Sequence, residues 1–133
     1  MIGVMTTTDR LTPAEAVRQS GFSLDTLRYY ERIGLLGTLE RSPGGRRRFT
    51  PDDLEWLGVL RCLRDTGMPI AEMLRYAGLV RAGESTLAER VELLEAHDVR
   101  VERQIAGLRA QQGRIRAKIG YYRTPKDGPP PAP

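Results

Sequence analysis

Hydroxyl-bearing and arginine side chains gather in two short stretches in the first 50 residues. The first stretch contains Ser23, Thr26, Arg28 and Tyr29, and the second is the arginine triplet 46–48. Short hydroxyls can hydrogen-bond to base edges, whereas guanidinium groups and a tyrosine hydroxyl suit phosphate oxygens. The two stretches predict contacts with DNA, although a triplet alone is also typical of a solvated turn. The candidate DNA-binding residues are Thr12, Ser23, Thr26, Arg28, Tyr29, Arg46, Arg47 and Arg48.

The side chains best suited to nucleophilic or metal chemistry occur once each, as Cys62 and His97. One cysteine allows neither a disulfide within the chain nor a multi-cysteine zinc site. A Ser/His/Asp or Cys/His/Asn set is not recognisable, and Gly44-Gly45 lies in a predicted hairpin rather than before a helix, as a phosphate-binding loop would. We therefore expect no enzyme activity, no metal and no cofactor, and we expect His97 to be solvated or interfacial.

The composition favours a small core and a polyanionic partner. The chain has 133 residues, of which 6% are aromatic and 29% charged, and its net charge is +4. These values fit short helices around one modest core, plus a helix that buries its face against a partner. No apolar run approaches the roughly 20 residues that span a bilayer, and the N-terminus lacks a signal-peptide pattern. We expect a cytoplasmic, nucleoid-associated protein without membrane contact.

Two short helices are predicted to carry the first stretch. Thr12-Pro13-Ala14-Glu15 combines an N-cap, a first-turn proline and a capping box, and Gly21 ends this helix. Ser23 is a natural N-cap for a second helix that continues to about Arg32. Two short helices joined by about three residues that include a glycine match a helix-turn-helix, but a generic helical hairpin would show the same spacing.

The arginine triplet falls in a predicted β-hairpin. Leu39 and Phe49 flank the turn residues Ser42-Pro43-Gly44-Gly45. Thr50-Pro51 then repeats the capping pattern and opens a third helix, and Pro69 opens a fourth that ends near residues 81–83. Successive strand residues alternate between faces, so the first and third arginines of the triplet share one side of the hairpin.

A long helix is predicted from Glu84 to about Tyr122, where no proline occurs. Its apolar residues follow alternating steps of four and three, which is a heptad pattern, and a helix of this length measures on the order of 55–60 Å. Such a narrow stripe needs a second long helix, although folding back on its own domain stays open. The candidate dimerisation residues are Leu87, Val91, Leu94, Val101, Ile105, Leu108, Ile115 and Ile119.

Several short motifs resemble those of the MerR family of transcription regulators, over about residues 11–77. The long C-terminal helix is similar to that family's antiparallel dimerisation helix in placement rather than in motif. Leu11, Arg46 and Pro69 depart from the family pattern, and Arg46 stands where the family usually has a tyrosine at the tip of the hairpin. The matching residues are Thr26-Leu27-Arg28-Tyr29-Tyr30-Glu31, Gly34-Leu35-Leu36, Arg41, Gly45, Arg47, Phe49, Asp53-Leu54, Leu63-Arg64, Gly67-Met68 and Ile70.

The resemblance implies a mainly α protein, with a winged helix-turn-helix followed by an antiparallel coiled-coil helix. It also implies a homodimer that bends and untwists a promoter with a long spacer, so that RNA polymerase can engage both promoter elements. The alternatives are a signal-independent architectural or excisionase-like DNA-binding protein and a coiled-coil adaptor. The expected organisation is a flexible lead at 1–10, the DNA-binding domain at 11–82, the dimerisation helix at 83–122 and a disordered Pro-rich tail at 123–133.

Cys62 is the candidate residue for sensing the signal to which such a regulator would respond. The segment around Cys62 resembles a branch of the family that answers aldehydes or other electrophiles through a lone cysteine. Arg61 and Arg64 could favour the thiolate, whereas Asp65 would oppose it. The other interpretation of Cys62 is a small buried hydrophobic residue, the usual fate of a free cysteine.

Overall fold

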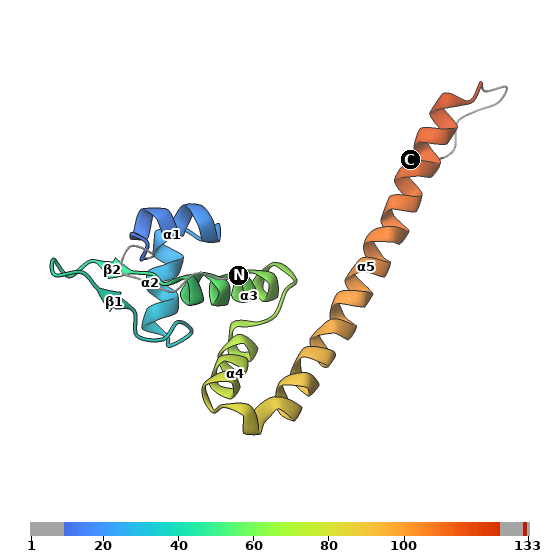
Figure 1. The fold of residues 1–133 in the computed structure, drawn as a ribbon. Helices are drawn as coiled ribbons and strands as arrows, with labels where there is room; N and C mark the ends of the chain where they lie inside the picture. Colours follow the sequence, from blue (N-terminus) through green and yellow to red (C-terminus); the bar gives the residue numbers. More distant parts are fainter. Residues whose placement is uncertain (1–9, 126–131, 133) are drawn as a thin grey trace, which may run out of the picture. The chain divides into compact units, whose positions relative to one another are not determined.

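The computed structural model describes residues 10–125 and 132, so all but the last residue of the expected lead at 1–10 and most of the expected tail at 123–133 lie outside the described residues. The described chain forms two compact units, one extending to Val91 and the other beginning at Glu92. Figure 1 shows the elements in chain order. They are α1 (Pro13–Ser20), α2 (Leu24–Arg32), β1 (Glu40–Arg41), β2 (Arg47–Arg48), α3 (Pro51–Asp65), α4 (Ile70–Arg81), the 3₁₀ turn η2 (Glu84–Thr86) and α5 (Leu87–Arg123).

Side-chain caps begin the first three helices, as the sequence predicts. The Thr12 hydroxyl accepts from the Glu15 amide at 3.2 Å, and the Glu15 carboxylate accepts from the Thr12 amide at 3.0 Å. Hydrogen bonding of the Glu15 carboxylate to Thr12, first to its backbone amide and then to its side chain, lowers the pKa of the Glu15 carboxyl. Thr50 and Asp53 form the same reciprocal box at α3, and Ser23 caps α2. The predicted helix starts are confirmed.

The core of the first unit lies between the helix-turn-helix and α3. Leu27, Leu35 and Leu57 are fully buried within it. The rings of Phe22 and Tyr30 meet edge to face with centroids 5.3 Å apart, and the Trp56 indole N–H donates to the Leu35 carbonyl at 2.9 Å. This packing fixes both short helices on one rigid support, which a DNA-reading surface requires.

The predicted hairpin is confirmed, but its strands are only two residues long. Arg41 pairs with Arg47 and Glu40 with Arg48 in antiparallel register. The turn closes with a 2.8 Å hydrogen bond from the Gly45 amide to the Ser42 carbonyl. An isolated bridge between Leu11 and Phe49 extends the hairpin at its base.

Thr86 and Arg90 organise the junction between α4 and α5. The Thr86 hydroxyl, buried in the junction, donates to the Leu79 carbonyl at 2.6 Å and accepts from Arg90 Nε at 3.0 Å. Arg90 Nη2 also donates to the Gly83 carbonyl at 2.6 Å. The Thr86 hydroxyl thus satisfies the Leu79 carbonyl in the last turn of α4, where carbonyls run out of helical partners. The short η2 turn within this junction was not predicted.

The long C-terminal helix is confirmed as α5, which contains 37 residues and is therefore about 55 Å long. Most of the predicted seam is exposed in the single chain, including Leu108 at 71% and Ile115 at 61%. Leu93, outside the predicted stripe, is buried, and so is His97, which contradicts a solvated position for the histidine. In the part of the chain that the structure describes, no helix combines the length and apolar character needed to cross a membrane.

Candidate nucleic-acid interface

The exposed face of α2 presents Arg28 and Tyr29. The Arg28 side chain is 53% exposed and forms a 3.8 Å ion pair with Asp25, while Tyr29 is 39% exposed. The Arg32 guanidinium lies over the Tyr29 ring at 5.3 Å. Tyr30, the next residue along α2, is instead buried, and burial raises the pKa of its hydroxyl. It shares the inner face of α2 with Leu27, three residues earlier, because residues at that spacing lie on one side of a helix.

Two of the predicted hydroxyl contacts, Thr12 and Ser23, serve first as helix caps. Thr12 caps α1, and the Ser23 hydroxyl accepts from the Thr26 amide at 3.1 Å. Ser23 also donates to the Thr26 hydroxyl at 2.9 Å. Each hydroxyl oxygen has a second lone pair that can accept another hydrogen bond, so a capping residue can also contact a nucleic acid. Their positions at helix N-termini suit an anionic partner.

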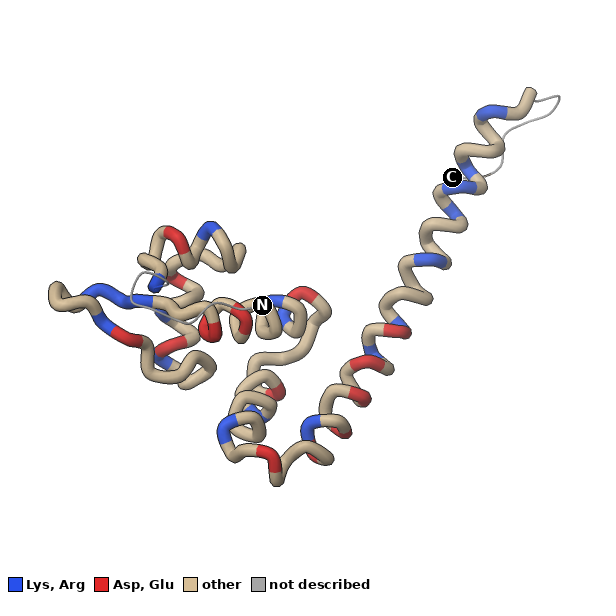
Figure 2. Tube along the Cα trace, viewed as in Figure 1, with Lys and Arg blue, Asp and Glu red and all other residues tan. Residues whose placement is uncertain are grey.

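A groove of about 560 Å³ lies between the helix-turn-helix and the hairpin. It brings together several predicted DNA-binding residues from elements that are separate in sequence, namely Thr12, Arg28, Arg46 and Arg47. Figure 2 shows the arginine triplet 46–48 as a continuous blue stretch along one arm of the hairpin. The groove is completed by Pro13, Ala14, Val17, Leu24 and Gly45. The three arginines among the lining residues suit a phosphate-bearing backbone.

The three arginines of the triplet 46–48 have different surroundings. Arg46 at the turn is exposed. Arg47 Nε donates to Glu31 Oε1 at 2.6 Å, and its side chain is only 23% exposed. Arg48 is half-buried near Glu40, whose carboxylate pairs with Arg10. The hydrogen bond from Arg10 lowers the pKa of the Glu40 carboxyl, and the positive charge of Arg48 lowers it further. No local pattern in the sequence indicated the Arg10 and Glu31 pairings.

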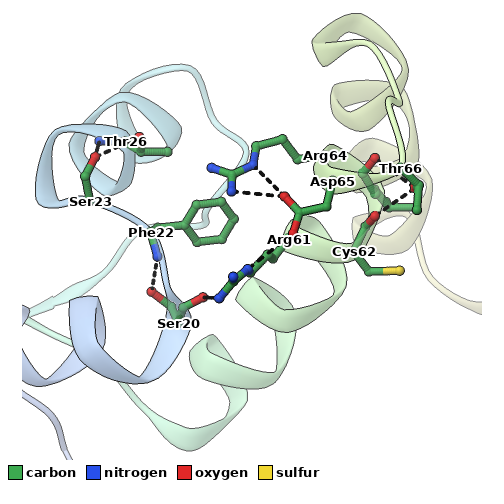
Figure 3. A network of polar contacts seen from close by, with 10 residues as sticks. Ser20, Phe22, Ser23, Thr26, Arg61, Cys62, Arg64, Asp65 and Thr66 are labelled. Carbon is green, nitrogen blue, oxygen red and sulfur yellow. Dashed lines mark hydrogen bonds and ion pairs between the residues drawn. The ribbon is translucent and has the colours of Figure 1, made fainter. Parts of the chain in front are cut away.

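A polar network ties the helix-turn-helix turn to the end of α3 (Figure 3). Arg61 Nη1 donates to the Ser20 carbonyl at 3.2 Å, and the Arg64 guanidinium lies 4.6 Å from the Phe22 ring centre. Both arginines also bind Asp65, and the hydrogen bond from Arg64 is the main cause of the lowered pKa of that carboxyl. These arginines were expected to act on the cysteine between them, and their contacts with the turn were not predicted.

Cys62 is exposed, so the interpretation as a small buried residue is wrong for the single chain. Figure 3 shows its sulfur pointing away from the Arg61 network. A helical wheel could have shown this. At 100° per residue, Cys62 lies about 160° from the centre of the face formed by Leu57, Leu60 and Leu63. Among the described residues, no group of three His, Cys, Asp or Glu side chains gathers to hold a metal.

Comparison with known proteins identifies the family. Residues 11–77 match the family described as MerR HTH family regulatory protein. An uncharacterised HTH-type transcriptional regulator from Haemophilus influenzae is 38% identical over 115 residues, which cover 86% of this chain and 85% of the relative.

Two solved structures agree with this assignment. HiNmlR, described as a MerR family regulator lacking the sensor domain and bound to promoter DNA, is 38% identical with a TM-score of 0.80. A MerR family regulator from Listeria monocytogenes is 38% identical with a TM-score of 0.79. Each alignment covers 86% of both chains. The chain therefore belongs to the MerR family of DNA-binding transcription regulators, which are not enzymes.

Proposed function

We propose that the protein binds promoter DNA as a homodimer, with α2 in the major groove and the hairpin on the adjacent backbone. The groove that joins Arg28 to Arg46 and Arg47 carries this proposal, because it presents cations from two elements around one concave surface. The promoter DNA in the HiNmlR structure supports the same partner class. Since its ligand would be chromosomal, we place the protein in the cytoplasm, associated with the nucleoid.

The second copy is proposed to pack along α5 in antiparallel orientation. Besides the exposed apolar seam, α5 has an asymmetric charge distribution, which Figure 2 shows as red positions in its first part and blue positions in its second. Residues 87–102 contain five carboxylates and two arginines, whereas residues 103–123 contain six cations and no carboxylate. An antiparallel partner places opposite charges side by side, but a parallel partner would place like charges together.

The DNA-binding surface can be tested through the salt dependence of binding. Replacing Arg46 and Arg48 by glutamine should reduce the slope of log affinity against log salt by about 0.9 for each phosphate that is no longer bound, which is up to roughly 3.6 if a dimer releases four phosphates. Fluorescence anisotropy with a labelled promoter duplex at several salt concentrations measures this slope. The matched control is Arg75→Gln, since Arg75 is an exposed arginine on α4. An unchanged slope in the double variant would remove these arginines from the interface.

The regulatory step is proposed to be a change in DNA shape. The dimer would bend and untwist a promoter with a long spacer and so align its two elements for RNA polymerase. Bending one site costs on the order of 1–6 kcal/mol, which a signal must supply through a protein element with two arrangements. The Thr86–Arg90 junction suits that role, because a few hydrogen bonds set the path of the chain from α4 into α5.

The signal is proposed to be an electrophile that reacts at Cys62. The Sγ atom would add to an aldehyde carbonyl carbon, and the thiol proton would pass to the carbonyl oxygen to give a hemithioacetal. The exposed sulfur satisfies the access that this reaction requires. Arg61, the residue before Cys62, and Arg64 contact the turn Ser20–Phe22 between α1 and α2. A group added to Cys62 is therefore adjacent in sequence to a residue that holds this turn.

Cys62→Ser should leave promoter affinity within about twofold and abolish induction by aldehydes. In vitro transcription with and without an aldehyde measures induction. Mass spectrometry locates the adduct without ambiguity, because the chain has one cysteine. Unchanged induction in the variant excludes Cys62 as the sensor. If neither protein responds to any electrophile, the signal-independent architectural alternative is favoured.

A further inference from the structure

One carboxylate joins α2 to both strands of the hairpin. Glu31, in the last turn of α2, accepts a 2.6 Å hydrogen bond from Arg47 Nε on β2. Arg41 Nη2 on β1 lies 3.2 Å from each Glu31 carboxylate oxygen. The Glu31 side chain is only 15% exposed, so both ion pairs are partly shielded from solvent. Such charge-assisted bonds are stronger than those between fully exposed charges.

The hairpin needs this attachment because its own strands are very short. Two residues in each strand cannot form an independently stable hairpin in water. Other described attachments, the Leu11–Phe49 bridge and the Arg10–Glu40 pair, lie toward the base of the hairpin. Glu31 instead holds the Arg41–Arg47 pair, which is the register position next to the turn. It therefore controls the end of the hairpin that carries Arg46.

We propose that Glu31 is a positioning residue for DNA binding, which sets the hairpin at a fixed angle to α2. Arg46 then reaches the backbone while α2 lies in the groove. This inference rests on the proposed DNA-binding mode. The positioning role predicts that removing the Glu31 carboxylate weakens DNA binding. The change in net charge alone predicts the opposite, because a more basic protein is attracted to DNA more strongly.

Glu31→Gln is therefore expected to weaken promoter binding about tenfold, which corresponds to about 1.4 kcal/mol. Fluorescence anisotropy at fixed salt measures the affinity. Asp25→Asn is the matched control, since it removes one carboxylate from the same helix, where Asp25 is 96% exposed. The control is expected to bind as tightly as the unchanged protein or more tightly. Glu31→Gln binding that equals or exceeds the unchanged protein would overturn the proposal.

A double-mutant comparison separates positioning from a loss of folding. If Glu31 acts through the hairpin, adding Glu31→Gln to Arg46→Gln should cause less than about a threefold further decrease in affinity, whereas a general folding defect would again cost the full tenfold. Thermal unfolding of all variants accompanies the comparison. A full tenfold decrease in the Arg46→Gln background contradicts the positioning role. If the unchanged protein binds no promoter duplex, the proposed function fails and the positioning role fails with it.

Discussion

Replacing Leu108 and Ile115 by glutamate is expected to convert the protein into a monomer and to weaken promoter binding by about two to four orders of magnitude. Both side chains lie in the exposed apolar stripe of α5. In a coiled coil, each would lose about 1.5–3 kcal/mol of apolar burial, and the new carboxylates would have to be buried at the seam. A dimer contains each substitution twice, so the effect on association is doubled.

The decrease in DNA affinity follows from the loss of linkage between two DNA-binding units. In a dimer, binding of one unit holds the second at a high effective concentration near its half-site. A monomer binds each half-site separately and has half the phosphate contacts, so its salt dependence also falls. Sedimentation velocity at micromolar concentration measures the oligomeric state, and anisotropy measures the affinity.

Ala110→Glu serves as the control for this experiment. Ala110 is exposed on α5, two residues after Leu108, and lies outside the heptad seam. Its substitution adds the same kind of charge to the same helix, so it separates the seam from a general effect of acidity on DNA binding. A double variant that remains dimeric, with the affinity of the Ala110→Glu protein, would show that α5 does not form the interface.

Features that depend on short spacing could be read from the sequence. The capping boxes at Thr12 and Thr50 join residues three apart, and α5 follows from a long apolar period without proline. The hairpin was predictable from its turn residues, Ser42 to Gly45. Each of these features is decided by backbone geometry over one or two turns, which local residue types largely determine.

Features that depend on distant partners were missed. Glu31 pairs with residues 10 and 16 positions away, and Arg61 reaches the Ser20 carbonyl 41 positions away. No local pattern selects such partners, because many arginines and carboxylates compete for each other on a chain with this composition. The exposure of Cys62 and the burial of Tyr30, by contrast, could have been predicted from the sequence. The position of each residue around its helix, relative to the apolar face, indicates whether it is buried.

Phe49→Ala is expected to destabilise the DNA-binding unit by about 3–5 kcal/mol, a large part of the roughly 5–15 kcal/mol that stabilises a typical domain. Phe49 is fully buried, and its backbone exchanges hydrogen bonds of 2.8 and 3.0 Å with Leu11. It also directly precedes Thr50, the N-cap of α3. Its ring therefore anchors the base of the hairpin to the core at the point where α3 begins.

Urea unfolding followed by tryptophan fluorescence isolates this effect from α5. Trp56, the only tryptophan, lies on α3 and donates to Leu35, so its emission reports the first unit. With a slope of about 1–3 kcal/mol per molar urea, the midpoint should fall by roughly 2 M. Phe49→Leu keeps most of the buried volume and should cost less than about 1.5 kcal/mol. Equal midpoints for the two variants would mean that the aromatic ring does not hold the hairpin to the core.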